Sequence, residues 1–429
     1  MGENKITAQE ENVLAASEYA YEAIPDGAKK SAWSMIIVLA GYLIAMSNFV
    51  TGAAVGYKMT FTNAVKALCI SDIYLVFICI AMGLIAFKFG ITTTVMSRKV
   101  LGKKGSLVLS AILSLSVVCW LGTNGDTFAK MIVAAFPMWP IPIGITAVIL
   151  MFVWLQSASR GYKGLEVVSM LGVPAAILLC VWVVMAAYKA TNNFEAVLAY
   201  MPEGNYSFTQ ATTAGVGSWI FGAISSMDVI RFAKKKSHFV VGGIVSFFVC
   251  LLALQLTGVI CAQATGKSDF VSSAAGLGIA LPTLICSFFA LWTTQDNNIY
   301  SATLSIQNIL GQTSLKGRFK HKSIAYALAI LAAAFSLTGA LNHVLTFVST
   351  LSVLLAPIPG LYLSEVYIVK NSSETRAFSS WGFISWIAAG ASGYYCNVNN
   401  VLVPPVISFL VAFILYTVLG KLLGKESSE

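Results

Sequence analysis

The chain has 429 residues, of which 57% are hydrophobic and only 10% are charged, and its formal net charge is +9. Soluble globular domains carry about 25% charged residues, so this composition excludes a soluble domain and indicates an all-α polytopic membrane protein. The eight cysteines stand singly in apolar runs and no two of the three histidines have metal-ligand spacing, which excludes a disulfide framework and a soluble-type zinc or redox centre.

The chain begins with a polar tail, residues 1–31, that lacks the pattern of a cleavable signal peptide. Twelve apolar segments follow, each about long enough to span a bilayer. We place them at 32–56, 64–87, 105–134, 141–158, 164–188, 209–231, 238–263, 276–309, 323–341, 344–368, 379–396 and 401–420. The expected organisation is a first five-helix repeat at 32–190, a second at 191–370, accessory helices at 371–421 and a tail at 422–429.

The basic residues predict the orientation of these spans. All but five of the 27 Lys and Arg residues lie in the two tails or in the connections after every second span. Such an excess is typical of cytoplasmic loops, so we expect both termini in the cytoplasm and the chain in the cell (inner) membrane. The positive charge then has acidic lipid headgroups as its neighbours, and nucleic acid is not an expected partner.

Two spans carry small and polar residues where Leu and Ile are expected. The first contains "AMSNFVTGAAVG" (45–56) and the sixth "TTAGVGSWIFGAISSMD" (212–228). Interrupted helices at matching positions of two halves are typical of the central site of secondary transporters, although small residues also serve close helix packing. Each interruption is followed after about 70 residues by a polar patch, so the two five-helix halves are expected to form an inverted repeat.

Aromatic and amide side chains follow the interruptions. Trp120 and Asn124 lie one helical turn apart in the third span, and Trp219 is expected within the break of the sixth. Two aromatic rings on opposite sides of a cavity can stack on a flat heterocycle, each contact contributing roughly 1–3 kcal/mol by analogy with nucleic-acid bases. The alternative is that both tryptophans are packing or interfacial residues. Asp72 and Asp126 are expected to pair with neighbouring helices.

The eighth span contains "LWTTQDNNIY" (291–300), which is costly at that depth unless it serves a site. Ala290, Thr293 and Thr294 lie on one helical face and offer a carbonyl and two hydroxyls, the oxygen ligands that suit a hard cation such as sodium. Back-bonding of the hydroxyls to the preceding turn is the alternative. Gln295 can read the edge of a heterocycle, whereas Asp296 has three open roles: substrate contact, proton carrier or helix anchor.

Three segments also resemble a known family. "WTTQDNNIYSATLSIQNILG", "GSWIFGAISSMDVIRF" and "NFVTGAAVG" resemble the matching segments of nucleobase–cation symport family 1, the purine/cytosine permeases. The resemblance implies the leucine-transporter fold, with ten core helices plus two, working by alternating access. The sodium ligands that it implies are Ala45, Asn48, Ala290, Thr293 and Thr294, and the substrate ligands are Asn48, Trp120, Asn124, Ser218, Trp219, Gln295 and Asp296.

Some positions depart from the family members that carry cytosine. Val117 stands where those members have glutamine, Gln295 stands where they have asparagine, and Asn124 and Trp219 are closer to the hydantoin-transporting type.

We therefore expect a sodium-coupled importer of a planar heterocycle, cytosine first, with no organic cofactor, acting as a monomer. The alternative is a proton-coupled carrier of a related ring: a purine, hydantoin, allantoin or hydroxymethylpyrimidine. Asp228 and Arg231 are expected to form a gate or ion pair. An enzyme or receptor would need a catalytic cluster or a soluble domain, so we expect neither.

Overall fold

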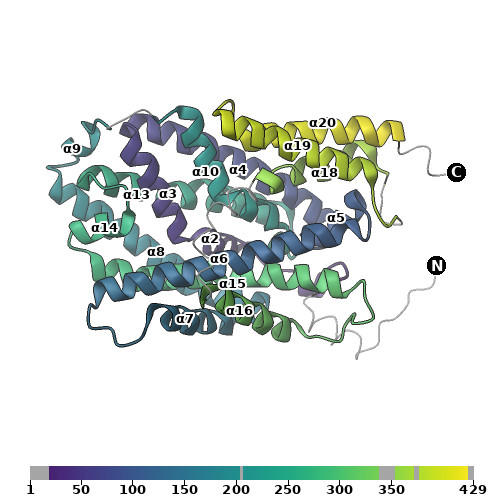
Figure 1. Ribbon diagram of the computed structural model, residues 1–429, viewed down its shortest axis with the longest axis horizontal. Helices are drawn as coiled ribbons and strands as arrows, with labels where there is room; N and C mark the ends of the chain where they lie inside the picture. Colours follow the sequence, from purple (N-terminus) through teal and green to yellow (C-terminus); the bar gives the residue numbers. More distant parts are fainter. Residues whose placement is uncertain (1–18, 203–205, 338–352, 372–375, 424–429) are drawn as a thin grey trace.

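The computed structural model describes residues 19–202, 206–337, 353–371 and 376–423, and the regular elements within them are helices (Figure 1). The first half holds η1 (Asp26–Ala28), α2 (Ala32–Leu43), α3 (Met46–Lys58), α4 (Phe61–Phe89), α5 (Thr93–Leu101), α6 (Gly105–Ala135), α7 (Ile143–Ala158), α8 (Tyr162–Ala190) and α9 (Glu195–Leu198). The second half holds α10 (Phe208–Ser225), α11 (Met227–Ile230), α12 (Lys236–Ile244), η2 (Val245–Cys250), α13 (Leu251–Thr265), α14 (Phe270–Gly276), α15 (Ala280–Leu310), α16 (His321–Leu337), α18 (Ile358–Ser364), η4 (Glu365–Val369), α19 (Ser380–Asn399) and α20 (Pro404–Leu423).

Five helices in the described part of the chain are long and apolar enough to cross a membrane, or six when the bent pair α2 and α3 is taken as one span. The five are α4, residues 105–133 of α6, α8, the continuous run from α12 to α13, and α20. Shorter apolar helices, Ile143–Ala158, His321–Leu337 and Val353–Val369, coincide with the expected spans four, nine and ten. Parts of spans nine and ten lie outside the described residues, so the count of twelve stays a prediction.

The break expected in the first span is present. Helix α2 ends at Leu43 and α3 begins at Met46, with a bend of 54° between them. Ala45 has an extended backbone, so the carbonyls around the break lose their helical partners. The Asn48 side chain donates a hydrogen bond to one of them, the Leu43 carbonyl. A buried amide therefore replaces part of the lost helical bonding.

The break expected around Trp219 in the sixth span is not where the sequence placed it. Helix α10 runs without interruption from Phe208 to Ser225, and the turn falls at Ser226, before the short α11. The glycines here permit close packing instead: a Cβ on Gly215 would lie 2.7 Å from the Cβ of Ser71 on α4. The turn at Ser226 lies within the predicted segment 212–228, but seven residues after Trp219, and the small residues before it serve helix packing.

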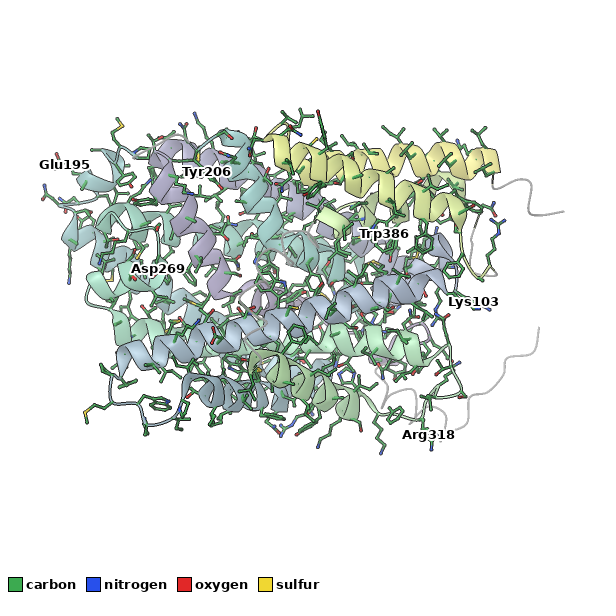
Figure 2. The ribbon with its side chains drawn as sticks, viewed as in Figure 1. Lys103, Glu195, Tyr206, Asp269, Arg318 and Trp386 are labelled. Atoms are coloured by element: carbon green, nitrogen blue, oxygen red, sulfur yellow. The ribbon has the colours of Figure 1, made fainter. Side chains whose placement is uncertain are left out.

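The helices lie side by side along the long axis of the molecule (Figure 1). Helix α15 packs against α6 and α8 and touches α2, while α3 packs on α13 and α10 on α4. Helices α19 and α20 form a pair along one edge. Lys103 and Arg318 lie at one end of the molecule, and Glu195 and Asp269 lie at the other (Figure 2). This segregation agrees with the predicted grouping of the basic connections.

Candidate functional site

A small cavity of about 40 Å³ lies beside the break in the first span. It is lined by Ala45 and Ser47 at the break, Trp120 and Asn124 on α6, Gly217, Ser218, Trp219, Phe221 and Gly222 on α10, and Thr294 and Asn298 on α15. Four substrate residues expected from the sequence, on α6 and α10, thus meet at one place.

Trp219 is held in position by three neighbours. Its indole N–H donates to Asn48 Oδ1, and its ring packs edge-on against Tyr42, with the ring centroids 5.2 Å apart. A Cβ on Gly222, one turn later, would lie 2.6 Å from Cζ3 of the indole and closer still to Cε3. The absence of a side chain at Gly222 is therefore what lets the ring lie back along α10. Asn48, expected to bind substrate, does not line this cavity, and its side chain contacts the indole of Trp219.

Asp296 does not line this cavity. Its Oδ1 accepts hydrogen bonds from the Ser157 hydroxyl at 2.7 Å and from the Ala158 backbone N–H at 2.9 Å, both at the end of α7. Its Oδ2 is buried and has no hydrogen-bond partner among the residues described. Of the three roles that the sequence left open, these contacts correspond to the helix anchor.

Gln295 is also buried behind the cavity wall. Its Nε2 lies 3.4 Å from the Leu121 carbonyl, and its Oε1 accepts a hydrogen bond from Asn298 Nδ2 at 3.3 Å. Asn298, rather than Gln295, therefore presents an amide to the cavity. The sequence contains this residue in its polar run, but helical spacing alone did not distinguish it from its neighbours.

Oxygen atoms converge on the hydroxyl of Thr294. The hydroxyl donates to the Ile44 carbonyl at 2.7 Å, and the carbonyls of Ala290 and Tyr42 lie at 3.2 and 3.5 Å. The helix-one carbonyls at this point are those of Tyr42 and Ile44, in place of the expected Ala45 and Asn48. The Ala45 carbonyl accepts the backbone N–H of Asn48 at 3.1 Å.

Thr293 sits in the tightest part of the same region. Its hydroxyl is 2.8 Å from that of Ser169 on α8. A Cβ on Gly41 would lie 2.6 Å from the Thr293 hydroxyl, and one on Gly172 would lie 2.8 Å from its methyl group. Helices α2, α8 and α15 therefore meet at this threonine with no space for a further carbon atom. The arrangement places a second hydroxyl next to the Thr294 oxygen cluster.

Asp228 and Arg231 are both buried, and their contacts differ from a simple pair. Asp228 Oδ1 accepts the Thr93 backbone N–H at 2.8 Å. The Arg231 guanidinium donates to the carbonyls of Asp228 and Tyr19, and to the Tyr300 hydroxyl at 3.1 Å. These contacts tie the segment before α2, the start of α5, the short helix α11 and α15 together.

The remaining acids depart from the expected helix-to-helix pairing. Asp126 forms an ion pair within its own helix, with Lys130 Nζ 2.6 Å away, because the two lie four residues apart on α6. Asp72 is fully buried on α4, and neither carboxyl oxygen has a hydrogen-bond partner in the described part of the chain.

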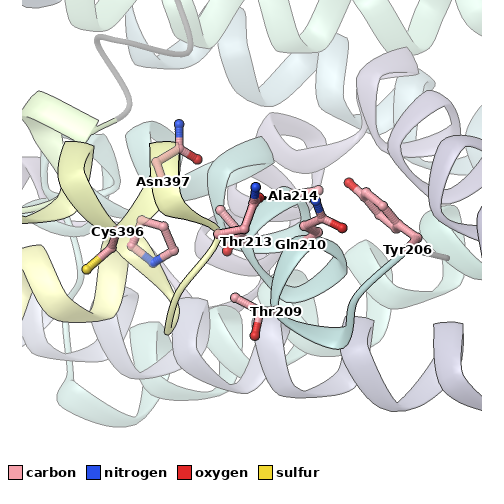
Figure 3. Close-up of a pocket in the computed structure, with 9 residues that line it drawn as sticks. Tyr206, Thr209, Gln210, Thr213, Ala214, Cys396 and Asn397 are labelled. Atoms are coloured by element: carbon pink, nitrogen blue, oxygen red, sulfur yellow. Dashed lines mark hydrogen bonds between the residues drawn. The ribbon is translucent and has the colours of Figure 1, made fainter.

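A second cavity, of about 300 Å³, lies away from this site, where α10 begins (Figure 3). Tyr206, Gln210 and Thr213 line one side and Asn397 and Cys396 the other (Figure 3). Gln210 donates across it to Asn400 at 3.1 Å. This cavity contains none of the residues expected from the sequence to bind substrate or ion.

Comparison with known proteins gives consistent matches over nearly the whole chain. A family model described as "Permease for cytosine/purines, uracil, thiamine, allantoin" matches residues 25–391. The cytosine permeases of Escherichia coli strain K12 and of Escherichia coli O157:H7 are each 24% identical over 407 residues, which is 94% of this chain and 94% of theirs.

Two solved structures with a similar fold are those of transporters. Mhp1, a nucleobase-cation-symport-1 family transporter, in a closed conformation with bromovinylhydantoin bound, has a TM-score of 0.79 at 14% identity, covering 95% of this chain and 94% of Mhp1. A Na+-coupled sialic acid symporter in a substrate-bound outward-open state has a TM-score of 0.67 at 11% identity, covering 96% and 95%.

Proposed function

The chain belongs to the family of permeases for cytosine/purines, uracil, thiamine and allantoin, and from this premise we propose that it is a sodium-coupled importer of a planar nucleobase-like heterocycle, with cytosine as the first candidate. The cytosine permeases among its relatives and the fold of Mhp1 support a carrier that is not an enzyme. We further propose twelve spans, a 5+5 inverted repeat with two added helices, cytoplasmic termini, an inner-membrane location and a monomeric working unit.

One observation carries this proposal: the candidate ion and ring sites share Thr294. Its side chain lines the cavity that contains both tryptophans, and its hydroxyl contacts the carbonyls at the break of the first span. A sodium ion at this point would take the oxygens of Tyr42, Ile44, Ala290, Thr293 and Thr294. It would hold α2 and α15 together and so complete one wall of the ring site.

The ring would lie between Trp120 and Trp219, with the amides of Asn124 and Asn298 at its edge. Amides suit such an edge because each offers both donors and an acceptor. The two tryptophans stand on different helices, α6 and α10, so entry and release of a ring between them would require these helices to separate and close again. Such opening and closing around a central site is what alternating access requires.

The test is uptake of radiolabelled cytosine into proteoliposomes, with and without an inward sodium gradient and with unlabelled heterocycles as competitors. We expect sodium-dependent uptake that Thr294→Ala abolishes. The matched control is Thr303→Ala on the same helix, because the Thr303 hydroxyl is equally buried but bonds only to the Ile299 carbonyl, at 2.7 Å. Equal sodium dependence in the two variants would refute the ion site, and uptake of a different ring would correct the substrate.

A proton-coupled carrier is the second candidate, since Asp296 has one buried carboxyl oxygen without a hydrogen-bond partner among the described residues. In that case a pH gradient would drive uptake without sodium, and Asp296→Asn would abolish the coupling while Thr294→Ala would have little effect. Under the sodium proposal, Thr294→Ala would abolish the coupling and Asp296→Asn would have little effect. The two variants measured under the two gradients therefore separate the candidates.

A further inference from the structure

An apolar groove of about 490 Å³ lies between the end of α7, the start of α8 and Trp292 on α15. Its walls are Val167, Val168 and Leu171 on α8 with the Trp292 ring, and its mouth carries Gln156, Ser157, Arg160 and Lys163. The groove is separate from the candidate transport site, with which it shares no lining residue.

The groove faces the surface on which a membrane would lie. Helix α8 passes the length and hydropathy test for a span, yet only a third of its most apolar window is buried inside the protein. Val167 and Leu171 in the groove wall are each 55% exposed. Large exposed aliphatic side chains on a spanning helix contact lipid chains, so the groove opens toward the hydrocarbon.

The dimensions correspond to one leaflet. Lys163, Val167 and Leu171 follow each other at four-residue spacing along one face of α8, so at 1.5 Å per residue the line from Lys163 to Leu171 extends about 12 Å. Half of a hydrocarbon core of about 30 Å is about 15 Å. The charged mouth therefore lies about one acyl-chain length from the inner end of the groove, at the level of the headgroups.

The mouth of the groove carries two basic residues. Arg160 and Lys163 stand on either side of the turn at Gly161, which has a φ of +67° and directly precedes α8. Neither forms an ion pair with a carboxylate in the described part of the chain. This includes Glu166, which stands three residues after Lys163 but is not paired with it. Basic residues between spanning helices at the headgroup level are typical binding sites for acidic lipid headgroups.

We propose that this groove binds one anionic phospholipid, with an acyl chain along Val167, Leu171 and Trp292 and the phosphate between Arg160 and Lys163. A free phosphate ion would satisfy the two cations but would leave the apolar groove without an occupant. A neutral lipid would fill the groove but would leave the two cations without a counter-charge. The inference does not rest on the proposed transport function.

The bound lipid would touch the polar part of α15. The Trp292 indole N–H donates to the Ser157 hydroxyl at 2.7 Å, and that hydroxyl donates to Asp296 at 2.7 Å. Trp292 directly precedes Thr293 and Thr294 in the chain. A lipid chain packed on the Trp292 ring therefore stabilises the contact between the α7–α8 turn and the helix that carries the candidate ion ligands.

The test is a lipid titration of the delipidated full chain in detergent, followed by native mass spectrometry. We expect one phosphatidylglycerol to bind tightly and phosphatidylcholine weakly. In the R160Q/K163Q variant, phosphatidylglycerol should bind about thirtyfold more weakly, since about 1 kcal/mol is expected for each basic residue. The matched control K103Q/K104Q removes two exposed lysines that do not line the groove, and it should bind as the parent does.

Leu171→Trp tests the acyl-chain part of the proposal, because it fills the groove and leaves both cations in place. It should weaken phosphatidylglycerol binding at least tenfold. Unchanged lipid affinity in R160Q/K163Q, or in Leu171→Trp, would overturn the proposal. Displacement of the lipid by millimolar inorganic phosphate would also overturn it, and would identify a free-anion site instead. Because binding is measured without transport, failure here is distinct from failure of the uptake experiment.

Discussion

Gly222→Ala should displace Trp219 without touching the candidate ion site. The added methyl would lie 2.6 Å from Cζ3 of the indole, whereas ordinary van der Waals contact begins at 3.4 Å. The ring must therefore move by about 1 Å or more, away from the position in which it lines the cavity. Alanine is itself favourable in a helix, by about 1 kcal/mol relative to glycine, so the variant should fold.

The expected loss of affinity follows from the stacking contact between the heterocycle and the Trp219 indole. A stacking contact between an aromatic side chain and a base contributes about 1–3 kcal/mol, so the dissociation constant of the transported heterocycle should rise about 5- to 150-fold. Sodium-induced thermal stabilisation, measured without the heterocycle, should persist, because the added methyl contacts none of the oxygens around Thr294. Gly276→Ala is the control, since its added Cβ would lie no closer than 3.6 Å to any atom outside its own helix backbone and neighbouring residues, and it is outside the site.

The assay is equilibrium binding of the heterocycle to Gly222→Ala, Trp219→Ala and the double variant. If Gly222→Ala acts through the ring, the second substitution should add nothing once Trp219 is gone. Additive losses in the double variant would refute this reasoning, as would full affinity in Gly222→Ala. In either case Trp219 would be a packing residue.

Three further substitutions test other parts of the site. Asn48→Ala should lower the stability to unfolding by about 1–3 kcal/mol, measured by denaturation in detergent, because it leaves the buried Trp219 indole N–H without its acceptor and removes one of the two hydrogen bonds to the Leu43 carbonyl; an unchanged midpoint would contradict this role. Gly41→Ala should weaken sodium binding in a sodium-titrated thermal shift, because the methyl would lie 2.6 Å from the Thr293 hydroxyl and closer still to the Ser169 hydroxyl; unaltered sodium affinity would contradict a role of Thr293 in the ion site. Asp126→Asn should change stability by less than about 0.5 kcal/mol, since its ion pair with Lys130 is partly exposed; a larger loss would indicate a role beyond that pair.

The sequence predicted the first-span break because small and polar residues replace Leu and Ile in that segment. Asn48 is an unusual residue in a spanning helix, and its side chain donates a hydrogen bond to the Leu43 carbonyl at the break. The sixth span carries similar small residues but no such amide, and its helix continues through Trp219. Glycine and serine alone do not distinguish an unwound helix from a closely packed one, because both structures require the absence of bulk.

The position of Asp296 could not be predicted from helical spacing. Its partners, Ser157 and Ala158, are 139 and 138 residues away in the chain, and only the packing of α7 against α15 brings them together. The Asp126 partner, in contrast, could have been found, because Lys130 stands four residues later on the same helix. Side-chain pairs within one helix can be predicted from the residue spacing, whereas contacts between spans that are distant in the chain depend on the fold.

The Asn48 side chain has a consequence for the energetics of coupling. One amide touches both the opened backbone of the first span, through the Leu43 carbonyl, and the indole of Trp219. Ligands at these two places would then act on a common group, and their binding would be thermodynamically linked. Linkage is reciprocal, so the factor by which the ion tightens ring binding must equal the factor by which the ring tightens ion binding. Removing the amide should reduce both factors to the same extent.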